Sequence, residues 1–224
     1  MVLSRTEENY LKAIYKLAER EQGKVSTNSI ASEMSTSAAS VTDMLKKLAE
    51  KELVSYQKYK GVQLTQAGTK YATQLVRKHR LWELFLVDTL GFGWDEVHEV
   101  AEELEHIQSD KLILALDEFL GFPKYDPHGD PIPNAQGKFT IRQRQLLADF
   151  EAGIPVELVG LKDHDTALLH HLDDLGIGLG TRLVIRERYT YDNSLKVAVG
   201  EGENECNLSP QVTEKIYVKL WPGS

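Results

Sequence analysis

The hydrophobic positions near the N-terminus follow a helical period three times and then an alternating one. Residues 5–21 carry an apolar stripe at helical spacing, and Ser26 is placed to cap a second, short helix. The polar run 35–40 then opens a third helix with its own apolar stripe. Two β-rich stretches around Gly61 predict a hairpin. Three helices followed by a hairpin are the order of a winged helix-turn-helix domain.

The middle of the chain shows broad apolar helical faces. One long helix is predicted from Thr65 to about Thr89, and another from about Asp95 to Leu120, after an interruption at GFGW. This much apolar surface beside a small module predicts a dimer interface. Residues 121–137 are rich in proline and glycine and predict a loop or linker.

Alternating β-rich segments fill the last part of the chain and predict a small β-barrel of the SH3-like kind. The expected fold class is therefore α+β, with three domains. They are a winged helix-turn-helix over residues 1–64, a helical dimerisation domain over 65–139 and the SH3-like barrel over 140–224.

The composition indicates where the protein is expected to act and shows that its charge is unevenly distributed. The single cysteine, Cys206, excludes an internal disulfide and a cysteine-rich zinc site, and it suits a reducing cytosol. The sequence shows neither an apolar signal core nor a membrane-length apolar run, so we expect a cytoplasmic protein with no membrane partner. The net charge is −8, but residues 1–80 have a balance of +6 and residues 81–224 one of −14. A polyanion-binding module on a cation-attracting body, or chance asymmetry on solvated faces, would give this distribution.

The helix opened by residues 35–40 is expected to be the recognition helix of the DNA-binding module. Small polar residues at a helix N-terminus can approach phosphates and base edges closely. An ordinary helix cap with solvated lysines is the alternative for the helix alone, whereas the whole ordered pattern favours DNA binding. The candidate DNA-binding residues are Ser37, Ala39, Ser40, Thr42, Asp43, Lys46, Lys47, Lys58 and Lys60.

Histidine and glutamate side chains crowd the two middle helices at spacings that place them on one face. His79 and Glu83 are four residues apart. A second set with one-face spacing consists of His98, Glu102, Glu105 and His106. Facing helices would bring these imidazoles and carboxylates together around metal ions, and such a site without thiolate suits Mn²⁺ or Fe²⁺. The alternative is that each pair decorates a polar face.

Several runs together resemble the diphtheria toxin repressor family, the iron- and manganese-dependent regulators of bacteria and archaea. These runs are TEENYLKAIYKL, SAASVTDMLKKLAEKELV, YKGVQLTQAG, RKHRLWELFL and VHEVAEELEHIQSD. The combination of KHRLWE with HEVAEELEH is highly specific, and the resemblance covers nearly the whole chain. It implies a homodimeric, metal-dependent repressor, not an enzyme, that binds palindromic operator DNA to control metal-uptake genes.

The resemblance also implies two metal sites per chain. The residues that match the first are His79, Glu83 and His98, and those that match the second are Glu102, Glu105 and His106. Asn9 stands where iron-type members commonly have Met and manganese-type members Asp, and its amide oxygen is a neutral donor. Asp126 replaces a cysteine that completes the outer site in a three-domain branch, and His128 matches that branch's histidine. The terminal barrel usually adds one ligand, for which the candidates are Asp163, His164 and Asp165.

The donor set favours manganese. Iron-type members usually carry cysteine at the position of Glu102, and a hard carboxylate oxygen suits Mn²⁺. We therefore expect Mn²⁺ as the cofactor, with Fe²⁺ in the same architecture as the nearer alternative. A metal-dependent enzyme that uses the His/Glu cluster is the farther one, although the sequence has a complete winged helix and no evident nucleophile.

Overall fold

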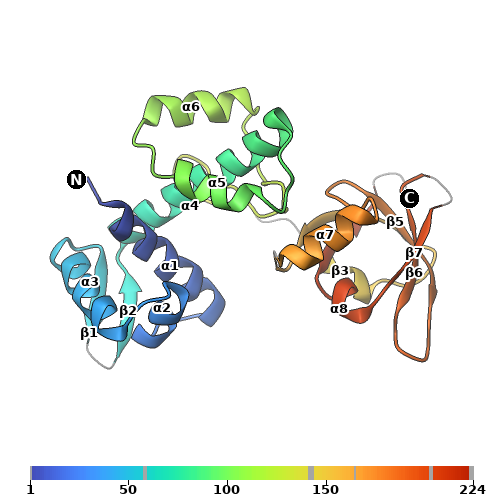
Figure 1. Ribbon diagram of the computed structural model, residues 1–224, viewed down its shortest axis with the longest axis horizontal. Coiled ribbons are helices and arrows are strands. Elements are labelled where there is room, and N and C mark those ends of the chain that lie inside the picture. Colours follow the sequence, from blue (N-terminus) through green and yellow to red (C-terminus); the bar gives the residue numbers. More distant parts are fainter. Residues whose placement is uncertain (1, 58–59, 141–143, 164, 202–203, 222–224) are drawn as a thin grey trace. The chain divides into compact units, whose positions relative to one another are not determined.

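The computed structural model describes residues 2–57, 60–140, 144–163, 165–201 and 204–221 (Figure 1). Its contacts divide the chain into two compact units. Unit 1 comprises Met1–Trp82, Ala101–Phe122 and Ile132–Phe139, and unit 2 comprises Glu83–Val100, Pro123–Pro131 and Thr140–Ser224. None of the described helices combines the length and apolar character needed to cross a membrane.

The first part of unit 1 confirms the predicted winged helix-turn-helix (blue in Figure 1). Its elements are α1 (Arg5–Glu21), α2 (Thr27–Glu33), α3 (Ala38–Glu50), β1 (Val54–Gln57) and β2 (Gly61–Leu64). Ser26 and Ser37 cap α2 and α3 as expected, because each hydroxyl accepts a hydrogen bond from a backbone N–H three residues on. The antiparallel hairpin requires glycine at Gly61, where φ is +81° and a Cβ would lie 2.8 Å from the Val25 carbonyl oxygen.

The core of this domain follows the apolar stripes of the sequence. Leu11, Ile14 and Leu17 of α1 are buried with Leu45 and Leu48 of α3 in one cluster. The charged residues on the buried side of α1 are the exceptions: Glu7, Glu8 and Lys12 are also buried. Because buried charges are costly without partners, these side chains are expected to form specific ion pairs.

Glu7 ties the start of α1 to the end of α3. Its carboxylate accepts hydrogen bonds from the Ser4 N–H at 2.9 Å, which completes a capping box, and from Lys51 Nζ at 2.6 Å. Burial raises the pKa of Glu7, but the hydrogen bonds from Lys51 and Ser4 outweigh it and hold the pKa below its ordinary value of 4.5.

Glu7→Gln is expected to lower the free energy of unfolding by about 1 kcal/mol at neutral pH, because glutamine keeps the capping box but loses the charge that pairs with Lys51. The folded-state pKa is depressed, so this stabilisation is present above the unfolded-state pKa and is lost as pH falls through the folded-state value. Urea denaturation from pH 7 downward should show the two proteins converging in acid. The exposed Glu21→Gln is the control, and an equal loss in both variants would contradict the pairing.

The helical part of the chain consists of α4 (Gln66–Leu90), α5 (Val97–Leu104) and α6 (Asp110–Phe119). The long helix from Thr65 is confirmed, whereas the prediction of one helix from Asp95 to Leu120 is wrong. Two helices form because the Ser109 hydroxyl accepts a hydrogen bond from the Leu112 N–H and starts a new helix. Glu105 and His106 consequently lie in the turn after α5.

Unit 2 contains the predicted small β domain. Its elements are β3 (Gln145–Leu146), η1 (Leu147–Asp149), β4 (Pro155–Leu161), α7 (Thr166–Asp174), β5 (Arg182–Arg188), β6 (Leu195–Val199), β7 (Glu205–Leu208), α8 (Pro210–Thr213) and β8 (Ile216–Leu220). The antiparallel sheet has the order β3-β8-β4-β5-β6-β7, and Leu158, Ile185, Val197 and Val218 are buried in its core.

A closed barrel, as expected from the sequence, is not formed by the described strands. β3 and β7 stand at opposite edges of the sheet, and β3 offers only two residues, which pair with β8. Irregularities in β4 between Leu158 and Gly160 and in β5 between Ile185 and Glu187 can bend the sheet. Closure nevertheless requires the edge strands to pair with one another, and they do not.

Candidate metal centres and nucleic-acid interface

Unit 1 brings together a cluster that we call the Lys12 cluster, made of Lys12 on α1, His79 on α4, Glu102 on α5 and Glu105 in the following turn. Lys12 Nζ lies 2.5 Å from Glu105 Oε2, 2.6 Å from Glu102 Oε1 and 3.3 Å from His79 Nδ1. His79 Nδ1 is also 2.7 Å from Glu105 Oε2. One ligand atom from each of the two glutamates and the histidine lies within 4.8 Å of the others, so the three could hold a metal ion.

Most of the charged groups in this cluster are buried, so they need partners of opposite charge. The Glu105 side chain is fully buried, and those of Lys12 and His79 are nearly so, whereas Glu102 reaches solvent. Glu105 Oε1 and Asn9 Oδ1 are buried oxygens that accept no hydrogen bond within the described part of the chain. Orphaned oxygens of this kind, beside two carboxylates, fit a site that takes a hard divalent cation.

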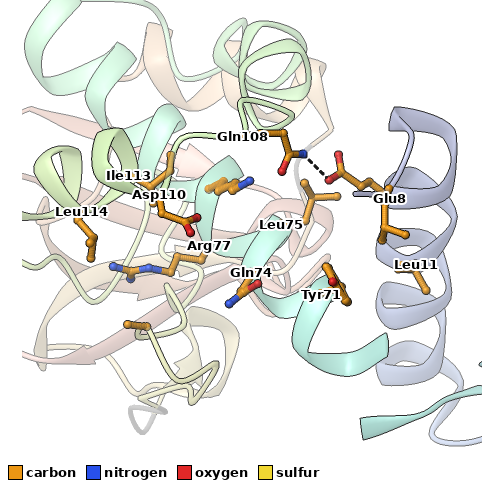
Figure 2. Close-up of a pocket in the computed structure, with 13 residues that line it drawn as sticks. Glu8, Leu11, Tyr71, Gln74, Leu75, Arg77, Gln108, Asp110, Ile113 and Leu114 are labelled. Carbon is orange, nitrogen blue, oxygen red and sulfur yellow. Dashed lines mark hydrogen bonds between the residues drawn. The ribbon is translucent and has the colours of Figure 1, made fainter. Parts of the chain in front are cut away.

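His106 extends the cluster toward the N-terminal end of α1. Its Nδ1 lies 2.6 Å from Glu8 Oε2, and its Nε2 lies 3.9 Å from Glu105 Oε1. Figure 2 shows Glu8 on α1 reaching toward Gln108, whose amide donates a 2.7 Å hydrogen bond to Glu8 Oε1. Glu8 and Gln108 border a pocket of about 410 Å³ that is also lined by side chains of α4 and α6, including Arg77. His106 is therefore held between carboxylates of two segments far apart in the sequence.

Unit 2 contains a second cluster, formed by Glu83, His98, Asp126 and His128. His98 Nδ1 lies 3.3 Å from Glu83 Oε1, and His128 Nδ1 lies 3.9 Å from Glu83 Oε2. Ligand atoms of Glu83, Asp126 and His128 lie within 4.8 Å of one another, and all three residues are buried. The predicted loop over residues 121–137 therefore buries two polar side chains, Asp126 and His128.

The orientation of His128 suits a metal ligand. Its Nε2 lies 2.6 Å from the Trp94 carbonyl oxygen and must donate to it, so in the neutral imidazole Nδ1 carries the lone pair, 3.9 Å from Glu83 Oε2. The loop packs closely against β4. A Cβ at Gly129, where φ is +84°, would lie 2.1 Å from the Val159 carbonyl oxygen, so only glycine fits there. Asp126 Oδ1 accepts hydrogen bonds from the His128 and Asp130 N–H groups, which fixes the turn.

The barrel candidates lie outside these clusters. Asp163 pairs with Lys215 at 2.7 Å and belongs to none of the metal-competent groups found among the described residues. Asp165 caps α7 by accepting from the Ala167 and Leu168 N–H groups. His164 is not among the described residues.

Comparison with known proteins identifies the family. Residues 2–62 match the iron dependent repressor N-terminal DNA binding domain, residues 65–134 the iron dependent repressor metal binding and dimerisation domain, and residues 145–220 the FeoA domain. The iron-dependent repressor IdeR of Mycobacterium tuberculosis is 30% identical over 196 residues, which are 80% of this chain and 83% of that protein. The chain belongs to the diphtheria toxin repressor family. Members of this family are metal-dependent transcriptional repressors.

Two further proteins are similar to this chain. A solved manganese-dependent transcriptional repressor in complex with manganese is 36% identical, has a TM-score of 0.79, and is covered completely, with 96% of this chain aligned. A probable metal transport system membrane protein of Chlamydia trachomatis is 45% identical over 91 residues, which are 41% of this chain and only 20% of that longer protein. The recognition of the family and the fold class expected from the sequence are thereby confirmed.

The candidate DNA-binding residues predicted from the sequence lie on α3, at its N-terminal cap and in the β1–β2 hairpin. Ser37, Ala39 and Ser40 are exposed at the start of α3, where the two serine hydroxyls lie 2.9 Å apart. Thr42 donates to the Ala38 carbonyl oxygen, and Asp43 pairs with Lys46 at 3.2 Å. Lys47 and Lys60 are exposed, and Lys58 lies outside the described residues. The hydroxyl groups of Ser37 and Thr42, which are candidate DNA contacts, form local hydrogen bonds within α3 and its cap.

Two residues at or beside the Lys12 cluster are not predicted from the sequence. Glu8 and Lys12 are four residues apart on α1 and are both buried beside the candidate ligands. A signal was available, because both lie on a helix face that also carries the apolar stripe. The sequence could not identify their partners, because these lie 67 to 100 residues away along the chain.

Proposed function

We propose that this chain is a manganese-dependent transcriptional repressor that binds palindromic operator DNA as a homodimer and controls metal-uptake genes in the cytoplasm. We further propose the three-domain division 1–64, 65–139 and 140–224 and an absence of catalytic activity. The observation that carries the proposal is the Lys12 cluster with His106, because it joins α1 of the DNA-binding domain to acidic residues at the end of α5.

The first proposed metal ion is held by Glu102, Glu105 and His106, with Asn9 and His79 as additional donors. The orphaned Oε1 of Glu105 and Oδ1 of Asn9 support this choice. Four of these five donors are carboxylates or imidazoles and the fifth is an amide oxygen, which is the donor set that suits Mn²⁺. When bound, the metal would supply positive charge between α1 and the turn after α5.

The second proposed metal ion is held by Glu83, His98, Asp126 and His128. The lone-pair nitrogen of His128, fixed by the Trp94 carbonyl oxygen, supports this site. A contribution from the SH3-like domain through Asp163 remains a proposal from the sequence, with Lys215 as the competitor for its carboxylate.

Metal binding and DNA binding would be coupled through α1. Metal favours the arrangement in which α1 is held against the α5 turn, and α1 packs in the same core as the recognition helix α3. If that arrangement also suits the operator, each ligand raises the affinity of the other by the same factor. Exposed Leu112, Leu114 and Phe119 on α6 support a homodimer, which matches paired half-sites.

Fe²⁺ activation is the second candidate, and the resemblance to the iron-dependent repressor IdeR favours it. Imidazole and carboxylate donors accept both ions, so the test must measure function rather than affinity. Operator binding by fluorescence anisotropy, at saturating Mn²⁺ or at saturating Fe²⁺ without oxygen, compares the two directly. Tight operator binding with Mn²⁺ supports the proposal, and a response to Fe²⁺ alone refutes it.

The exposed lysines of α3 give a separate prediction about DNA binding. Lys46→Ala and Lys47→Ala are each expected to weaken operator and non-operator DNA alike and to reduce the salt slope of binding by about one, because lysines at these positions would contact phosphates. Anisotropy titrations at several salt concentrations measure both effects. The exposed Lys111→Ala on α6 is the control.

Asp43 provides the contrast to these lysines. It pairs with Lys46, and as a carboxylate it is repelled by phosphate but can accept from cytosine N4. If Asp43→Ala changes the preferred operator sequence, Asp43 reads a base, and if the preference is unchanged it does not. Loss of sequence preference in the Lys46 variant would contradict its assignment as a phosphate contact.

A further inference from the structure

The ammonium group of Lys12 lies at the centre of the acidic cluster. It is within 2.6 Å of one oxygen from Glu102 and one from Glu105, and 3.3 Å from His79 Nδ1. The Lys12 and Glu105 side chains are 5% and 0% exposed, so the pair is shielded from solvent. These contacts tie α1 to α4 and α5 without any metal.

The three residues that contact Lys12 Nζ are the same residues that form a metal-competent group, in which one ligand atom from each lies within 4.8 Å of the others. A metal ion bound to them would lie where the ammonium lies. Two cations cannot share this space, because of both steric overlap and charge repulsion at low local dielectric. Occupation by Lys12 and by a metal at these donors is therefore mutually exclusive.

We propose that Lys12 is a tethered cation that competes with the activating metal and so sets the metal concentration at which this protein responds. The inference rests on the proposed function, since it assigns a role at the first proposed metal site. Without a counter-cation, the fully buried Glu105 beside Glu102 would leave uncompensated charge in the interior. Lys12 thus stabilises the metal-free fold and raises the metal concentration needed for activation.

A neighbouring pocket could accept the Lys12 side chain if a metal displaced it. A pocket of about 280 Å³ adjoins the cluster and is lined by Asn9, Lys12, Glu33 and Glu102, among others. Glu33 carries a carboxylate there whose side chain is 34% exposed and pairs with the exposed Arg20. A displaced Lys12 side chain could keep a carboxylate partner and gain solvent in this pocket, because a lysine stem is flexible.

The test is a direct metal titration of the full chain without DNA. Lys12→Met keeps most of the side-chain volume and removes the charge. We expect it to bind Mn²⁺ more tightly, by on the order of tenfold, in calorimetry or in competition with a chelating indicator. Its metal-free thermal midpoint should fall and should recover when Mn²⁺ is added. Lys70→Met, which removes an exposed lysine of α4 outside the Lys12 cluster, is the matched control and should change affinity little.

The outcomes separate the two proposals. Tighter binding in Lys12→Met but not in Lys70→Met supports the tethered cation, and equal or weaker binding in Lys12→Met overturns it while leaving the metal site intact. Absence of Mn²⁺ binding in all proteins overturns the metal site and the role of Lys12 together. If Lys12→Met is unfolded without metal, Lys12→Gln, which keeps a hydrogen-bond donor, is titrated instead with the same expected direction.

Discussion

Replacing His106 with alanine is expected to abolish metal-activated operator binding while leaving a folded dimer. His106 is nearly buried, and its two ring nitrogens face carboxylates of Glu8 and Glu105. The variant removes an imidazole that would bind the first metal and that connects α1 to the turn after α5. We therefore expect operator affinity at saturating Mn²⁺ to fall by roughly 100-fold, to the metal-free level.

Anisotropy with and without Mn²⁺ measures the loss, and size-exclusion chromatography with light scattering checks the dimer. His171→Ala is the matched control, because His171 is an exposed histidine on α7. If the His106 variant keeps the full metal response, His106 is not a ligand. If it is monomeric or unfolded, His106→Gln, which keeps hydrogen bonding to Glu8, replaces it in the same assay.

The identity of the activating metal gives the second large effect. Mn²⁺ is expected to activate the unmodified protein well, and Glu102→Cys is expected to shift the preference toward Fe²⁺ or Zn²⁺. Glu102 offers a hard oxygen and cysteine a soft thiolate, which binds Mn²⁺ poorly relative to later metals. The loss of the Mn²⁺ response should be at least about 10- to 100-fold, which is typical even when a residue behind the ligands is changed.

Affinity for the metal is the wrong measurement here, because later divalent metals bind most sites more tightly whatever they activate. The comparison is operator affinity at saturating Mn²⁺, Fe²⁺ and Zn²⁺, with iron handled without oxygen. Glu103→Cys is the control, since Glu103 is the neighbouring exposed residue on α5. An unmodified protein that ignores Mn²⁺ and responds fully to Fe²⁺ would establish the iron alternative.

The sequence by itself determined the elements whose signals are local. Amphipathic periods, the serine caps at Ser26 and Ser37 and the turn at Gly61 predict the winged helix, because each depends on residues within a few positions of one another. The helical spacing of His79 and Glu83, and of Glu102, Glu105 and His106, likewise predicts candidate ligands, although Glu105 and His106 lie in the turn after α5 and not on a helix. The cap at Ser109 was also local, but the continuous apolar pattern across it hid the break between α5 and α6.

Only the tertiary structure decided which partners these side chains meet. Lys12 lies on the apolar face of α1, but its place among Glu102, Glu105 and His79 exists only because α1 packs against α4 and α5. The orientation of His128 depends on the Trp94 carbonyl oxygen, 34 residues away. The open sheet depends on the length of β3, which pairs with a strand at the far end of the chain. Contacts across such separations leave no periodic trace in a single sequence, because they are set by how complete elements pack rather than by their neighbours along the chain.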